Sequence, residues 1–131
     1  MNKLSPGIHG VLDYTTVFFL FFSPVIFRMQ DSASTFTVAL AVVHFVLTVL
    51  TNFQAGVIKI IPLKVHGIIE GLVAIVLIGV AIFFKTSGDN VSFYYYLSFS
   101  GVLILVWLLS DYNSAPASVI EPGSKGQIKK L

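Results

Sequence analysis

The chain has 131 residues, of which 56% are hydrophobic and only 11% are charged, and its mean hydropathy is +0.90. Soluble domains carry about 25% charged residues, so this composition excludes a soluble surface and indicates one small membrane-embedded unit. The net charge of +2 is too small for a nucleic-acid-binding surface. Because the sequence has no cysteine, disulfides, thiolate chemistry and Cys-ligated metals are excluded.

Four apolar stretches are long enough to cross a bilayer, which takes about 20 helical residues. They cover residues 6–27, 35–53, 63–84 and 93–109. Strands of membrane barrels are nearer 10 residues and alternate in polarity, so residues 1–112 predict an all-α, integral membrane four-helix bundle. Ser5 and Pro6 are typical of a helix start, and Asp31 with Ser32 predicts a cap for the second helix. Residues 113–131, with Pro, Gly and Ser in no period, predict a flexible cytoplasmic tail.

The first segment is not typical of a cleaved signal peptide, because His9 and Asp13 lie inside its apolar part and no Ala-x-Ala-like site follows. Positively charged loops lie mostly in the cytoplasm. The loops after the first and third segments carry only Arg28 and Lys85. Six lysines lie in the N-terminus, the middle loop and the tail: Lys3, Lys59, Lys64, Lys125, Lys129 and Lys130. We therefore expect both termini in the cytoplasm.

The sequence also contains an internal repeat. "IHGVLDY" (8–14) aligns with "VHGIIEG" (65–71), which pairs His9 with His66 and Asp13 with Glu70 at an offset of about 57 residues. "LTNF" (50–53) aligns with "LSDY" (109–112) at an offset of about 59. These matches predict two tandem helical hairpins, residues 5–53 and 62–112. An even number of spans separates them, so they are parallel repeats related by an axis along the membrane normal.

These motifs, together with Ser23-Pro24 and "LTNFQAGVIKIIPLKVHG", resemble the small bacterial multi-pass membrane proteins that carry SPW repeats. The resemblance covers most of residues 5–112. It departs from the pattern at Val25, where the Trp is expected, and at Asn52-Phe53, where Asp-Tyr is common. The resemblance implies a compact multi-helix protein of the bacterial inner membrane. That family is largely uncharacterised, so the resemblance implies no activity.

Each repeat places a histidine and an acid four residues apart, on one face of its helix. Asp13 lies about 10 Å along a helix that starts at Pro6. It is therefore beyond the first turn, to which the effect of the helix dipole is confined. Carboxylates inside a membrane are costly and usually face a bundle interior or a wet cavity. We therefore expect two such pairs to face each other near the cytoplasmic end, with supporting groups at the ends of the second and fourth helices. The full predicted set is His9, Asp13, His66, Glu70, Asn52 and Asp111.

Three functions fit such a set of side chains. The first hypothesis is a non-enzymatic membrane protein whose His/carboxylate site binds or relays protons or cations. The second is a site for a divalent metal such as Zn, Mn or Fe. The third is a structural or accessory subunit whose polar layer only locks the helices together.

The expected partners are the lipid bilayer and either a homo-oligomer or an unidentified membrane protein, with no nucleic acid. No phosphate loop, Ser-His-Asp arrangement or zinc-protease signature indicates an enzyme. The metal ligands would be His9, Asp13, His66 and Glu70.

His44 lies near the centre of the second segment, where a charged imidazolium is costly. We expect a neutral side chain that forms a hydrogen bond to a neighbouring helix, through Ser98 or Ser100. The alternatives are haem ligation or a second proton station. Haem normally takes a second axial ligand at similar depth, and His9 and His66 both lie nearer the cytoplasmic end. The sequence therefore disfavours a transmembrane haem.

Overall fold

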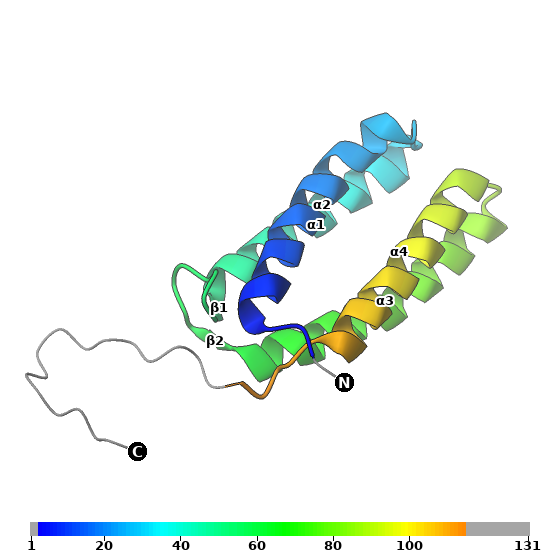
Figure 1. Ribbon diagram of the computed structural model, residues 1–131. Helices are drawn as coiled ribbons and strands as arrows, with labels where there is room; N and C mark the ends of the chain where they lie inside the picture. Colours follow the sequence, from blue (N-terminus) through cyan, green and yellow to red (C-terminus); the bar gives the residue numbers. More distant parts are fainter. Residues whose placement is uncertain (1–2, 115–131) are drawn as a thin grey trace, which may run out of the picture.

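The computed structural model describes residues 3–114 (Figure 1). This part contains four long helices, α1 (Pro6–Ile26), α2 (Asp31–Leu50), α3 (Leu63–Thr86) and α4 (Asn90–Leu109), and two short strands, β1 (Thr51–Asn52) and β2 (Ile61–Pro62). All four helices are long and apolar enough to cross a membrane. The predicted all-α four-helix membrane bundle is therefore confirmed. The predicted tail lies outside the described residues from residue 115 onward.

The start of α1 follows the predicted cap, and the start of α2 does not. The Ser5 side chain accepts a hydrogen bond from the Ile8 amide, with Pro6 in the first turn. The second helix begins at Asp31, with Gln30 at its N-cap and no side-chain cap, so the prediction that Asp31 and Ser32 cap it is wrong. Only four residues connect α1 to α2. Asp31 therefore already lies in the first helical turn, where its carboxylate interacts favourably with the positive end of the helix dipole.

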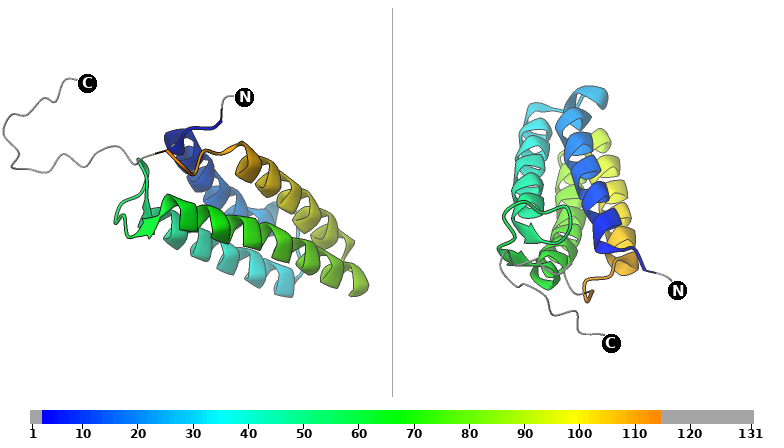
Figure 2. Two further views of the ribbon diagram at one scale, coloured as in Figure 1. Left: turned by 90° about the horizontal axis from the view of Figure 1, so that it is seen from below. Right: turned by 60° about the vertical axis from the view of Figure 1, so that its left-hand side comes forward.

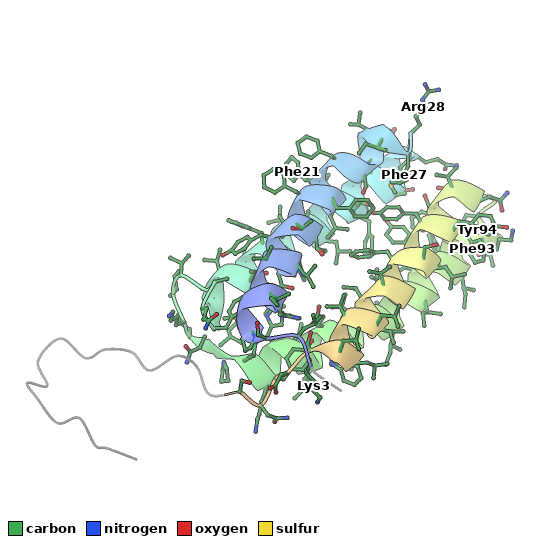
Figure 3. The ribbon with its side chains drawn as sticks, in the orientation of Figure 1. Lys3, Phe21, Phe27, Arg28, Phe93 and Tyr94 are labelled. Carbon is green, nitrogen blue, oxygen red and sulfur yellow. The ribbon has the colours of Figure 1, made fainter. Side chains whose placement is uncertain are left out.

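The chain forms two helical hairpins that lie side by side. The α1 helix packs along α2, and α3 packs along α4. In Figures 1 and 2 the two hairpins run together, with the N-terminus, β1 and β2 at one end of the bundle. Figure 3 shows Lys3 at this end and Arg28 at the opposite end. The two ends therefore differ in the charged residues that they present.

The same strand pairing occurs once for each repeat. Thr51 of β1 lies opposite Ile61 of β2 in a parallel pair. An isolated parallel bridge joins Ser110 to Leu4. Leu4 is the repeat equivalent of Ile61, and Ser110 is the equivalent of Thr51. Each pair ties one hairpin to the other, as expected for two parallel repeats around a pseudo-twofold axis.

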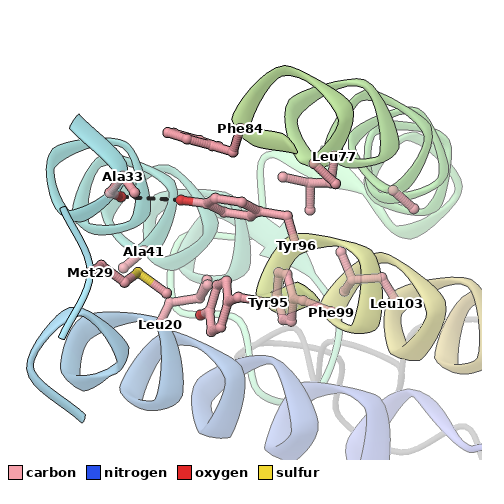
Figure 4. Close-up of a cluster of buried hydrophobic side chains, with 12 residues drawn as sticks. Leu20, Met29, Ala33, Ala41, Leu77, Phe84, Tyr95, Tyr96, Phe99 and Leu103 are labelled. Carbon is pink, nitrogen blue, oxygen red and sulfur yellow. Dashed lines mark hydrogen bonds between the residues drawn. The ribbon is translucent and has the colours of Figure 1, made fainter. Parts of the chain in front are cut away.

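The buried core between the hairpins combines small residues with aromatic rings (Figure 4). Alanines let the helices approach closely, as in other membrane bundles: Ala33, Ala41, Ala74 and Ala81 are fully buried. The Tyr96 hydroxyl lies 2.6 Å from the Thr37 hydroxyl and donates to the Ala33 carbonyl. Thr37 and Tyr96 are repeat equivalents, so this contact marks the pseudo-twofold axis. The outer faces instead present large apolar side chains to lipid, for example Phe18, Ile75 and Leu105.

Candidate functional site

Five ionisable side chains converge at the end of the bundle that holds β1 and β2. His9 and Asp13 come from α1, His44 from α2, and His66 and Glu70 from α3. Four of them form a tight group, in which one possible ligand atom of each residue lies within 4.8 Å of those of the other three: His9, Asp13, His66 and Glu70. His44 is outside this group. These four side chains are at most 3% exposed. The two predicted His–acid pairs therefore do meet across the pseudo-twofold axis.

The glycine after each histidine makes room for an aromatic ring. The Phe53 ring packs on Gly10, and the Tyr112 ring packs on Gly67. A Cβ on Gly67 would lie 2.7 Å from the nearest Tyr112 ring atom, closer than carbon atoms can approach. Phe53 and Tyr112 are repeat equivalents, so both halves use this device. The repeated His-Gly sequence thus brings a covering ring over each histidine.

A hydroxyl group fixes the orientation of each of these two histidines. The Ser110 hydroxyl lies 2.7 Å from His9 Nδ1 and donates to the backbone carbonyl four residues earlier. The Thr51 hydroxyl lies 2.8 Å from His66 Nδ1 and also donates to the carbonyl four residues earlier. A hydroxyl has only one proton to donate, so each Nδ1 must be the donor to the hydroxyl oxygen. In the neutral imidazole, Nε2 is then left with a lone pair that faces the centre of the site.

The contacts at the centre are longer than hydrogen bonds. His9 Nε2 lies 3.4 Å from the Asp13 carboxylate, 3.5 Å from Glu70 and 3.5 Å from His66 Nε2. His66 Nε2 lies 3.4 Å from Asp13. Hydrogen bonds between nitrogen and oxygen span about 2.7–3.2 Å. Asp13 Oδ2 has no hydrogen-bond partner among residues 3–114.

These lone pairs and carboxylates repel one another unless positive charge lies among them. Protons on the imidazoles would supply such charge, and so would a metal ion. In tetrahedral coordination, metal–ligand bonds of about 2.0–2.1 Å place neighbouring ligand atoms about 3.3–3.4 Å apart. Charge-assisted hydrogen bonds would instead bring nitrogen and oxygen to about 2.7–2.9 Å. The observed separations of 3.4 and 3.5 Å are nearer to the first arrangement, with His9 facing Asp13 Oδ1 and His66 facing Asp13 Oδ2.

Glu70 is held from outside the cluster by Tyr112, whose hydroxyl donates to Glu70 Oε2 at 2.6 Å. Burial raises the pKa of Tyr112 well above its usual range, and the negative charge of the neighbouring Glu70 raises it further. The hydroxyl therefore stays protonated and remains a donor. The equivalent position in the first repeat is Phe53, which has no hydroxyl. The two halves of the site therefore differ in how their carboxylates are held.

Asn52 and Asp111, which were predicted to support the site, are not among the side chains that converge in it. Side chains alternate along a strand, and Thr51 and Ser110 take the inward positions. Asp111 instead accepts hydrogen bonds from the Ser114 hydroxyl and the Asn113 amide. These bonds, which lie away from the cluster, lower the pKa of Asp111. The supporting groups are thus one residue earlier in the sequence than predicted.

His44 lies beside the cluster, although it was predicted to form a hydrogen bond through Ser98 or Ser100. Ser100 donates to the Ala74 carbonyl and not to His44. His44 Nε2 lies 3.6 Å from Asp13 and has no hydrogen-bond partner among the described residues. The second helix ends at Leu50, so His44 lies about 9 Å from that end, close to the depth of Asp13. Comparing depths along antiparallel helices would have found it.

No protein-family model, curated protein or solved structure matches the chain. Its class therefore follows from its own fold and site. The chain is a four-helix membrane bundle with a buried cluster of histidines and carboxylates inside one end. Any more particular function must be argued from the geometry of that cluster.

Proposed function

We propose that the protein binds a divalent first-row transition metal in this cluster. The observation that carries the proposal is the convergence of histidine lone pairs and carboxylates at the spacing of metal ligands. The ligands would be His9 and His66 through Nε2, with Asp13 and Glu70 through oxygen. His44 lies 3.6 Å from the Asp13 carboxylate and outside this set of four, so it would act behind the Asp13 ligand.

The charge of the site supports a dication. Two carboxylates and neutral imidazoles carry a formal charge of −2, which one divalent ion neutralises. A buried charge is tolerated only when it is compensated in this way. Imidazole nitrogen and carboxylate oxygen together suit zinc, iron(II) and manganese. The hydroxyl groups of Thr51 and Ser110 act behind two of the ligands, as the partners of ligating histidines do in metalloproteins.

A second candidate function is proton handling by the same side chains. The hydrogen bond from Tyr112 to Glu70 favours it, because it links the cluster to residues beyond the end of α4. In that state the imidazoles would be protonated and would draw the carboxylates to shorter distances than those observed. If the cluster only locked helices together, direct hydrogen bonds between its members would be expected. For these reasons the metal site is the better supported of the three functions.

Elemental mass spectrometry of the protein purified in mild detergent tests the proposal. We expect close to one zinc, iron or manganese per chain. The double variant His9→Ala/His66→Ala should lose the metal, and the matched control Asp111→Asn should keep it, since Asp111 lies outside the cluster. Metal-free wild-type protein that also takes up no metal on titration would refute the proposal. Proton uptake measured in liposomes would then decide for the second candidate.

We further propose that the protein is a divergent SPW-repeat-like protein of the bacterial inner membrane, with both termini in the cytoplasm. The support is the distribution of positive charge and the paired hairpins. Lys3 lies at the end that carries the cluster, and Arg28 lies at the other (Figure 3). Positive residues concentrate on the cytoplasmic side. On this proposal the metal site lies inside the cytoplasmic half of the bundle.

A further inference from the structure

The two carboxylates of the cluster face its centre in different ways. Asp13 turns both of its oxygens toward histidines: Oδ1 lies 3.4 Å from His9 Nε2, and Oδ2 lies 3.4 Å from His66 Nε2. Glu70 turns Oε2 toward His9 Nε2, at 3.5 Å, and the same oxygen accepts the hydrogen bond from Tyr112. Each oxygen of an ionised carboxylate has about two lone pairs. Glu70 Oε2 therefore has one lone pair left for a metal ion.

The Tyr112 ring is held on several sides, so its hydroxyl has a defined position. The ring packs on Gly67 and stands edge-on to the His9 ring, with the two ring centroids 5.4 Å apart. The strand bridge at Ser110 anchors the backbone two residues earlier. An oxygen that accepts from a fixed donor cannot turn freely. Tyr112 therefore sets the direction in which Glu70 meets an ion, as groups behind metal ligands commonly do.

The repeat shows that the fold does not require this hydroxyl. Phe53, the equivalent of Tyr112, packs its ring on Gly10 in the same way. It has no hydroxyl, and Asp13 Oδ2 has no hydrogen-bond partner within residues 3–114. A phenyl ring is thus enough to cover one histidine of the site. The hydroxyl of Tyr112 is an addition to that ring, and the Glu70 carboxylate accepts its hydrogen bond.

The donors that face the centre suit a metal with four or five ligands. Each histidine supplies one nitrogen, Glu70 supplies one lone pair, and Asp13 supplies one or two oxygens. Zinc takes four ligands and can expand to five, whereas manganese prefers octahedral sites. Octahedral bonds of about 2.1 Å place adjacent ligand atoms about 3.0 Å apart. The three separations at His9 Nε2, of 3.4, 3.5 and 3.5 Å, are nearer to the tetrahedral value of about 3.3–3.4 Å.

We propose that this site selects zinc over manganese and that Tyr112 sets the selection. This inference rests on the proposed metal site and names its metal. The Tyr112 hydroxyl takes one lone pair of Glu70 Oε2 and so holds that carboxylate to a single bond with the ion. Without the hydroxyl, Glu70 is free to bind through both oxygens. Together with two nitrogens and both oxygens of Asp13, that makes the six donors of an octahedral ion.

Competition titrations with Zn²⁺ and Mn²⁺ test the proposal on the full-length protein, stripped with a chelator in detergent. Sites of nitrogen and oxygen favour zinc over manganese in general. The quantity to compare is therefore the ratio of the two affinities in the wild type and in Tyr112→Phe, which copies Phe53. The variant should lose about 10–100-fold in zinc affinity and keep its manganese affinity, so the ratio should fall by the same factor. The matched control Tyr14→Phe removes a hydroxyl that donates to the Ala55 carbonyl and should keep the wild-type ratio.

Cobalt(II) gives a second readout, which a merely structural role of the hydroxyl would not change. Tetrahedral cobalt(II) absorbs visible light much more strongly than octahedral cobalt(II), because a tetrahedral site has no centre of symmetry. We expect the strong spectrum from the cobalt-loaded wild type and from Tyr14→Phe. Tyr112→Phe should show the weak spectrum at the same cobalt content.

Three results would overturn the proposal. The first is an octahedral cobalt spectrum from the wild type, which would contradict the donor count without use of any variant. The second is an unchanged affinity ratio and cobalt spectrum in Tyr112→Phe, which would show that the hydroxyl only satisfies a buried carboxylate. The third is an equal fall of the ratio in Tyr14→Phe. In each of these cases the protein still binds metal, whereas wild-type protein that binds none of the three ions would refute the metal site itself.

Discussion

Replacing His44 by leucine should lower metal affinity and at the same time stabilise the metal-free protein. Leucine suits this position because Leu103, the repeat equivalent of His44, is buried in the second hairpin. The substitution therefore introduces a side chain that the same architecture already accommodates. It removes only the imidazole that faces Asp13.

The two effects have opposite signs for a physical reason. Without metal, His44 Nε2 is a buried polar atom that lacks a partner among residues 3–114, and such an atom costs about 1–3 kcal/mol. Removing it should raise the free energy of unfolding of the metal-free protein by about that amount. With metal, the same atom would lie behind the ligand Asp13, 3.6 Å from its carboxylate. Losing a partner behind a ligand costs about 10–100-fold in affinity, so loss of His44 should weaken metal binding by a similar factor.

The assay uses protein stripped with a chelator and then titrated with Zn²⁺ against a competing indicator. Thermal unfolding is followed on the stripped and reloaded samples. We expect the His44→Leu variant to unfold at a higher temperature than wild type when stripped, and to gain less from reloading. A variant that is less stable when stripped and binds Zn²⁺ normally would refute this reasoning, and His44 would then be a packing residue.

Three further outcomes are expected. Ser110→Ala and Thr51→Val should each weaken Zn²⁺ binding about 10–100-fold in the same competition titration, and an unchanged affinity would contradict the assigned tautomers. Chelation should lower the unfolding temperature of the wild type but not of the His9→Ala/His66→Ala variant, because metal at 100 times its Kd stabilises by about 2.7 kcal/mol; equal shifts would exclude a bound metal. In this cysteine-free chain, Lys59→Cys should react with a membrane-impermeant thiol reagent only from the cytoplasmic side and Arg28→Cys only from the outside, and the reverse pattern would invert the proposed topology.

The helices and the two His–acid pairs could be predicted because their signals are periodic and local. Long apolar runs indicate membrane helices, and the repeat offset places His9 opposite His66. The end of α2 was harder to predict, because Thr51 and Asn52 are as compatible with a last helical turn as with a strand. Their pairing with β2 depends on a contact with a distant segment.

Misplacing that helix end by three residues had consequences for the site. With the helix end predicted too late, His44 fell at the centre of the predicted segment. Its position at the same depth in the membrane as Asp13 was therefore missed. The same error also hid the strand alternation that turns Thr51 inward and Asn52 outward.

The covalent link between the two hairpins has an evolutionary consequence. A homodimer of identical hairpins would have to carry a histidine or a leucine at both copies of position 44, and a tyrosine or a phenylalanine at both copies of position 112. The fused chain carries His44 with Leu103, and Tyr112 with Phe53, around an otherwise duplicated site. Fusion therefore released each half from the constraint of matching the other. One half could change its chemistry while the other preserved the scaffold.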